Sequence, residues 1–140
     1  MASRPVRLLA VFLLGAVWLP PGGFPARADQ ARLVAEGRED YGWHCAACHG
    51  DTGKGDGPMA EILVLPPTDL TGIAAKHGGD FPFWRIYEVV AGAQSVTGHE
   101  TFQMPRFWSR FRGDEGKPGY LPARVRILLL THYLESIQQP

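Results

Sequence analysis

The sequence predicts an all-α domain in which a few helices are joined by long loops. Helical spacing of apolar residues recurs in three segments, 29–45, 81–93 and 121–140, and no segment shows the alternation of a strand. The 140-residue chain also contains 17 glycines and 12 prolines, many of them between those segments. A chain of this length is enough for one domain. Its loop-rich build limits the core, so an internal cross-link or a bound cofactor would stabilise it.

Residues 1–28 have the pattern of a secretory signal peptide. Two arginines precede an apolar run, residues 8–19, and an Ala-x-Ala pattern ends at Ala28. The run is shorter than the roughly 20 residues that span a bilayer. We therefore expect cleavage after Ala28, export to the periplasm and a mature domain of residues 29–140 without stable membrane insertion. An uncleaved, membrane-anchored form is the alternative.

The net charge changes when the residues of the expected signal peptide are left out of the count. The whole chain has 14 basic and 14 acidic residues, but three of the arginines lie within residues 1–28. The expected mature domain therefore keeps 11 basic against 14 acidic residues, a net charge of −3. It has no basic run and no ladder of aromatic residues among basic ones, so nucleic acid is not an expected partner.

The first predicted helix covers residues 29–45. Asp29 is expected to cap it, and Leu33, Gly37 and Tyr41 fall on one face. A glycine on an apolar helix face costs about 1 kcal/mol relative to alanine. Such a glycine is tolerated where another backbone packs closely against it.

The other two predicted helices have clear ends. In residues 81–93, Pro82 suits the first turn and Gly92 suits the C-cap. The last helix, residues 121–140, starts at Pro122 and is the most strongly periodic. Its apolar face comprises Leu130, Tyr133, Leu134 and Ile137.

Two long segments between the helices are expected to be irregular. Residues 50–79 are rich in turns, and only 59–65 suit a helical turn or two. Residues 94–120 form the second such segment. Long loops without secondary structure are usually functional or disordered. Two of them in one small domain suggest that they wrap around a bound group.

Both cysteines of the chain lie in the sequence Cys45-Ala-Ala-Cys48-His49, for which four interpretations compete. A disulfide would close a very short loop and stabilise little. A thioredoxin-type redox pair requires a preceding strand, but a helical pattern precedes this motif. A structural zinc site needs four ligands, and the chain has no second cysteine pair. We favour covalent haem attachment through Cys45 and Cys48, with His49 as an axial iron ligand, because the motif and the export signal agree.

The iron then needs a second axial ligand, and Met104 is the predicted one. Met59 is only ten residues beyond His49, too near in sequence to reach the opposite ring face. Met104 is 55 residues beyond His49, and Pro105 favours an extended backbone there. A methionine more often fills a core, and His99 is the competing ligand. The remaining histidines are expected to be solvent-exposed: His44, His77 and His132.

With these residues in place, the sequence resembles the class I c-type cytochromes, in particular bacterial single-haem members. Gly37, Tyr41 and Cys45 have the spacing of the family's N-terminal helix. Leu130 and Tyr133 match its C-terminal helix, which crosses the first. The resemblance implies a cytochrome c fold, a few helices and long loops around one covalently bound haem. The helix crossing also supplies the close backbone contact that Gly37 requires.

The resemblance also implies roles for the loops. A proline carbonyl accepts a hydrogen bond from the second nitrogen of the axial histidine; Pro67 is the favoured match and Pro66 the alternative. The sequence Gln-Met-Pro-Arg-Phe resembles the family's ligand loop and supports Met104. Residues 108–120 depart from the family as an insertion. We expect a surface loop there; a lid over the haem edge and a partner contact are the alternatives.

The implied function is the carriage of single electrons between periplasmic redox partners. Iron with histidine and methionine ligands has no open position for a substrate, so no enzymatic activity is expected. The partners would be a transient electron donor and acceptor, with the chain a monomer or a subunit of a complex. Two alternatives are a haem subunit of a larger periplasmic oxidoreductase and a haem-based sensor or ligand-binding protein. Expected haem-pocket residues are Leu65, Leu70, Phe83, Tyr87, Phe102, Phe107 and Trp108.

Overall fold

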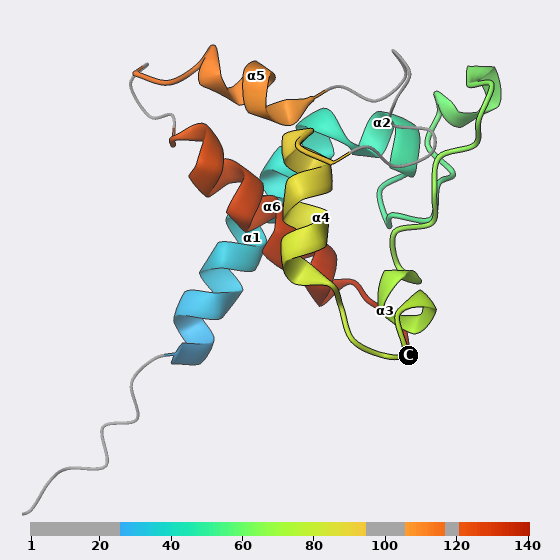
Figure 1. Ribbon diagram of the computed structural model, residues 1–140, viewed down its shortest axis with the longest axis horizontal. Helices are drawn as coiled ribbons and strands as arrows, with labels where there is room; N and C mark the ends of the chain where they lie inside the picture. Colours follow the sequence, from blue (N-terminus) through green and yellow to red (C-terminus); the bar gives the residue numbers. More distant parts are fainter. Residues whose placement is uncertain (1–25, 95–105, 117–120) are drawn as a thin grey trace, which may run out of the picture.

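The computed structural model describes residues 26–94, 106–116 and 121–140, and within these ranges it contains helices and no strand. Long connections separate the main helices (Figure 1). This confirms the predicted all-α fold with long loops. Nowhere in the described ranges is a helix both long and apolar enough to cross a membrane. The elements are α1 (Ala26–His44), α2 (Ala46–His49), η1 (Ala60–Ile62), α3 (Ile73–Lys76), α4 (Phe83–Ala91), α5 (Phe107–Arg112) and α6 (Ala123–Ser136).

The crossing of α1 and α6 lies at the centre of the fold, as the two helices pass each other in Figure 1. A Cβ atom added to Gly37 would lie 2.0 Å from the backbone oxygen of Leu129. This confirms the expected close approach at Gly37. Beside it, the rings of Tyr41 and Tyr133 pack with their centroids 5.0 Å apart. Leu33, on the same predicted face, is 38% exposed, so the buried contact begins one turn later.

The helix ends differ slightly from the predicted ones. Gly92 adopts a left-handed conformation with φ of 80° and ends α4, as predicted. Pro82 and Pro122 each stand just before a helix rather than inside its first turn. α1 begins at Ala26, so Asp29 lies in its first turn and is not the cap. There its negative charge still suits the partial positive charge of the helix N-terminus.

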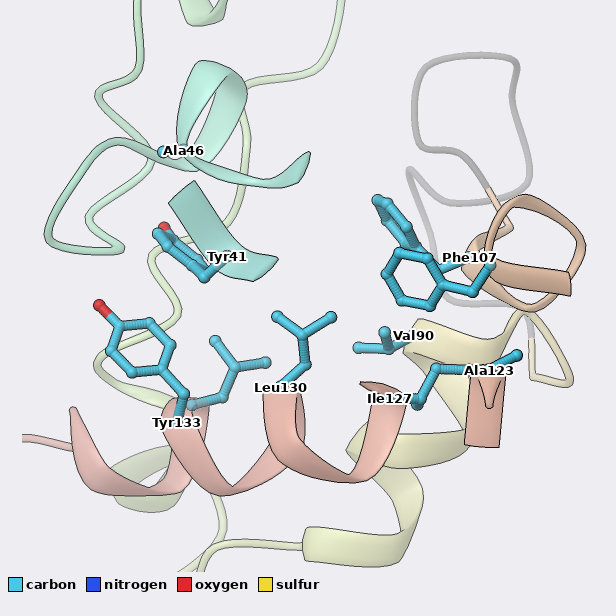
Figure 2. Close-up of a cluster of buried hydrophobic side chains, with 10 residues drawn as sticks. Tyr41, Ala46, Val90, Phe107, Ala123, Ile127, Leu130 and Tyr133 are labelled. Atoms are coloured by element: carbon cyan, nitrogen blue, oxygen red, sulfur yellow. The ribbon is translucent and has the colours of Figure 1, made fainter. Parts of the chain in front are cut away.

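The largest difference from the sequence-based expectation is α5, which occupies part of the predicted loop. Phe107 and Phe111 stand one turn apart and are both buried, with ring centroids 5.5 Å apart. Figure 2 shows Phe107 pointing toward Val90 and Ile127. The expectation of a surface loop from residue 108 is therefore wrong for this part. Burial of an aromatic pair at helical spacing is the physical reason that a helix forms there.

The residues after α5 stabilise the start of α6. Oε1 of Glu115 accepts a hydrogen bond of 2.9 Å from the backbone N–H of Ala123, the first residue of α6. Backbone N–H groups in the first turn of a helix have no partner within the helix. Glu115 therefore accepts a hydrogen bond from the first turn of α6, as an N-cap side chain would, although it lies eight residues before Ala123. Of the turns predicted over 59–65, only η1 forms.

Candidate functional site

The cysteine motif lies where α1 passes into α2. The backbone N–H of Cys45 bonds the carbonyl of Tyr41 at 2.8 Å, and that of His49 bonds the carbonyl of Cys45 at 2.9 Å. This turn places Cys45 and Cys48 about one helical turn apart, as half-buried free thiols. Burial raises the pKa of Cys45 to about 12, so its thiol is protonated at neutral pH. The turn presents two thiols and an imidazole from one short stretch of backbone.

His49 is held as a neutral imidazole. Its side chain is buried, at 8% exposure, and Nδ1 lies 3.0 Å from the backbone oxygen of Thr68. A carbonyl oxygen only accepts, so Nδ1 carries the proton and Nε2 keeps its lone pair. Burial lowers the pKa of His49, and the bond to Thr68 opposes this shift. A ligand nitrogen with its partner nitrogen bonded to a carbonyl is typical of metal-binding histidines.

The residue that accepts this bond corrects one prediction. The predicted acceptor was the carbonyl of Pro67, but the structure has the carbonyl of Thr68, the next residue. The oxygen of Pro67 faces Gly55 instead, where an added Cβ would lie only 2.3 Å away. Gly55 has a φ of 81°, a conformation that glycine adopts at no steric cost. The prediction of Pro67 is therefore wrong in register, because paired prolines do not indicate which carbonyl points to the ring.

The segment that carries Thr68 is fixed from several directions. Oδ1 of Asp69 accepts bonds from the backbone N–H and the hydroxyl of Thr71, at 2.8 and 2.7 Å. These bonds hold the pKa of Asp69 below its usual range. The N–H of Leu70 bonds the carbonyl of Gly53 at 2.7 Å, and Nε2 of Gln138 donates to the carbonyl of Leu70 at 2.8 Å. The orientation of the His49 ring thus depends on a loop that is anchored at both sides.

Tyr41 provides a second support that the sequence analysis missed. Its buried hydroxyl donates a 2.6 Å hydrogen bond to the carbonyl of Gly50, the residue after His49. Burial raises the pKa of Tyr41, so the hydroxyl remains a donor. The sequence does contain a signal for this bond. Tyr41 carries a hydroxyl at a position predicted to be buried, and a buried tyrosine hydroxyl usually has a hydrogen-bond partner.

His44 was expected to be solvent-exposed, and this expectation is wrong. Its ring packs edge-on against Phe111, with centroids 5.2 Å apart. Its Nε2 lies 3.2 Å from a guanidinium nitrogen of Arg126, which itself bonds Asp40 through Nε at 3.0 Å. Burial and the Arg126 charge lower the pKa of His44. His44 is a neutral acceptor beneath α5, and only the three-dimensional fold brings these groups together.

The other predicted residues are spread over several settings. Met104 and the competing ligand His99 lie outside the described residues. His77 is exposed, as expected, whereas His132 is half-buried against Phe83 with ring centroids 4.7 Å apart. The expected haem-pocket residues differ in burial. Phe107 is buried, and three are half-buried: Leu70, Phe83 and Tyr87. Two are exposed, Leu65 and Trp108, and Phe102 lies outside the described residues. Across the described part of the chain, no group of three or more His, Cys, Asp or Glu side chains could hold a metal ion.

Comparison with protein families identifies the class of protein. Residues 34–114 match the family model described as cytochrome c, more than half of the chain. The match begins within α1, contains the Cys45–His49 motif and ends just after α5. The chain therefore belongs to the cytochrome c family, whose members use haem c for electron transfer. Comparison with curated proteins and with solved structures gives no significant match.

Proposed function

We propose that this protein is an exported cytochrome that carries one electron at a time through a single covalently bound haem. The observation that carries the proposal is the geometry of residues 45–49. It combines two thiols about one turn apart with an imidazole whose Nε2 lone pair is kept free by the Thr68 bond. These residues fit a c-type haem, with Cys45 and Cys48 as thioether attachments and His49 as an axial ligand. The haem, when bound, supplies reversible one-electron oxidation and reduction of its iron.

The protein's own contribution is to hold the ligand and limit rearrangement. Thr68 fixes the tautomer and ring orientation of His49, and it increases the basicity of Nε2. Tyr41 and the anchored 68–71 segment hold the backbone on either side of the ring. Rigid ligand placement suits electron transfer, in which the iron changes charge without exchanging ligands.

Met104 is the proposed second axial ligand, on the strength of its Met-Pro sequence and its distance from His49 along the chain. A histidine–methionine pair favours the reduced state more than anionic ligation does. It also leaves no position for a substrate, and the proposal therefore assigns no enzymatic activity. A subunit role in a larger oxidoreductase and a haem-sensor role remain the competing proposals.

The deciding experiment produces the full chain in bacteria that contain a c-type maturation system. Absorption spectra are recorded for the wild type, Met104→Ala and the control Met59→Ala. We expect covalent haem in all three, and loss of the red absorption band of methionine-ligated ferric haem only in Met104→Ala. An unaltered ferric spectrum of Met104→Ala would exclude this ligand.

Two further measurements separate the competing functions. Carbon monoxide should bind the reduced wild type poorly and Met104→Ala readily; ready binding by the wild type would favour the sensor. Purification from native membranes and periplasm should yield the cytochrome alone. Stoichiometric copurification with a catalytic subunit would favour the oxidoreductase role, and retention of residues 1–28 would favour a membrane anchor.

A further inference from the structure

α5 carries a basic surface away from the core. Phe107 and Phe111 point inward, so the rest of this short helix faces outward. Trp108 is 39% exposed, large for a tryptophan, and Arg110 and Arg112 are exposed beside it. α5 lies over the N-terminal half of α6, at the upper edge of the molecule in Figure 1. We define the α5 basic face as Arg106, Trp108, Arg110, Arg112 and Arg124.

Most of the positive charge on this face is not neutralised within the described part of the protein. Arg106, Arg110 and Arg124 form no ion pair with any described residue. Nε of Arg112 lies 3.9 Å from Glu115, whose other oxygen is bonded to the start of α6. An exposed pair of this length contributes little. The face is thus a positive region on an expected mature domain of net charge −3.

The surface is shaped as well as charged. Trp108, Arg112 and Arg124 line an open hollow of about 440 Å³, together with Glu115, Gly116 and Pro122. Arg110 lies at the edge of the basic face, where it lines a second hollow of about 690 Å³. Glu36 and Glu39 of α1 line that second hollow, so negative charge borders the basic face there. The border restricts how an acidic partner could be oriented.

The buried side of α5 packs against the end of α1, next to the haem-attachment motif. The ring of Phe107 lies 6.0 Å from the ring of His44, the residue before Cys45. On the other side, the side-chain stem of Arg106 lies against Gly92 at the end of α4. α5 is therefore packed, through Phe107, against the residue that precedes the haem-attachment motif.

We propose that the α5 basic face docks an acidic surface of a redox partner protein, with Arg112 and Arg124 pairing with carboxylates and Trp108 packing between them. This inference rests on the proposed function. Arginine and tryptophan are enriched where interfaces derive most of their energy. Guanidinium groups bind carboxylates through paired hydrogen bonds. With haem bound, one electron would pass between its iron and the partner's one-electron centre, so that one is oxidised and the other reduced, and no bond would form or break.

The test uses reduced holoprotein and small redox reagents of known charge. Stopped-flow rates are measured with hexacyanoferrate(III), which is anionic, and with a cationic cobalt(III) chelate, over a range of ionic strength. For Arg112→Glu/Arg124→Glu we expect an about fivefold lower rate with the anionic reagent and a weaker salt dependence. The rate with the cationic reagent should rise.

The matched control is Arg32→Glu/Lys76→Glu, which changes the net charge equally on exposed residues of α1 and α3, outside the α5 basic face. If both double variants alter the rates equally, net charge alone is responsible and the proposal fails. The milder Arg112→Gln/Arg124→Gln should give the same directions with smaller changes, which guards against misfolding of the reversed-charge protein.

A polyglutamate peptide added to isotope-labelled holoprotein provides the macromolecular test. We expect amide chemical-shift changes confined to α5 and the start of α6, and their loss in the α5 variant. Absence of changes there would overturn the proposal. Two other outcomes would overturn the proposal. Binding to anionic phospholipid vesicles without peptide binding would assign the face to a membrane surface. A wild-type dimer that dissociates in the α5 variant would assign the face to a second copy of the chain. If no haem is attached, the proposed function fails; if haem is attached but the peptide does not bind at α5, only the docking proposal fails.

Discussion

α6 packs against α1, α4 and α5, and two of its contact regions are built differently. At the crossing with α1, Gly37 allows backbone contact, and Tyr41 packs on Tyr133. Under α5, Arg126 lies 3.8 Å above the centre of the Phe111 ring and pairs with Asp40. The crossing depends on close apolar packing, whereas the region under α5 depends on a nearly buried charge with its partners. The first should be sensitive to added volume, and the second to the loss of one charge.

The largest effect is expected from adding one methyl group at the crossing. Gly37→Ala should lower the free energy of unfolding by more than about 3 kcal/mol, because the new Cβ meets a backbone oxygen that cannot move independently. Guanidinium unfolding of the holoprotein measures this. Gly42→Ala, on the same helix with open space around it, should instead stabilise by about 0.5–1 kcal/mol. Equal effects of the two changes would contradict the close contact.

Removing one charge under α5 should have the next largest effect. Asp40→Asn leaves Arg126 nearly buried without its main counter-charge, although Asp114 remains 3.4 Å away. We expect a loss of about 2–3 kcal/mol in the same unfolding measurement. Glu36→Gln removes the exposed pair with Arg32 and should cost no more than about 0.5 kcal/mol. A loss from Asp40→Asn as small as that of the control would show that Arg126 is well solvated.

The hydroxyl of Tyr41 offers a finer test of the crossing. Tyr41→Phe keeps the ring packing but removes the hydrogen bond to Gly50, and we expect a loss of about 1–1.5 kcal/mol. The control Tyr87→Phe removes a hydroxyl without a hydrogen bond to any described residue, and it should be nearly neutral. Both are read from the midpoint of denaturant unfolding. Similar midpoints for Tyr41→Phe and the wild type would mean that water replaces the bond fully.

The smallest effect is a pH dependence that arises under α5. The pKa of His44 is lowered from its ordinary 6.5 in the folded protein, so the unfolded chain binds its proton first as the pH falls. The stability contributed by neutral His44 is fully present above pH 6.5. It decreases as the pH falls from 6.5 to the lowered pKa of His44 in the folded protein. Unfolding curves at neutral and mildly acidic pH should differ less for His44→Gln than for the wild type. The exposed-histidine control His77→Gln should keep the wild-type difference, and a flattened profile there would contradict this assignment.

The two regions also differ in how far the sequence predicts them. Local spacing predicts the faces of α1 and α6, and the resemblance to class I cytochromes implies that these faces cross at Gly37 and Tyr41, which the structure confirms. The pairing of Asp40 with Arg126 joins residues 86 positions apart, and no local pattern indicates it. α5 had a local signal, the spacing of Phe107 and Phe111, but the surrounding glycines and charges favoured a loop.

The same distinction applies to the candidate site. The motif Cys45–His49 predicts the attachment chemistry because its residues are adjacent in the chain. The carbonyl that orients His49 depends on the register of a turn. That register follows from the contact between Gly55 and Pro67, which sequence spacing does not reveal.

Covalent attachment of one haem is tested by the mass of the denatured protein after production with a c-type maturation system. We expect the mass of the chain plus one haem that resists extraction by acidified solvent. Cys45→Ser and Cys48→Ser should each weaken this attachment, and together they should abolish it. A wild-type mass equal to that of the chain alone, or of the chain with more than one haem, would exclude a single covalent haem.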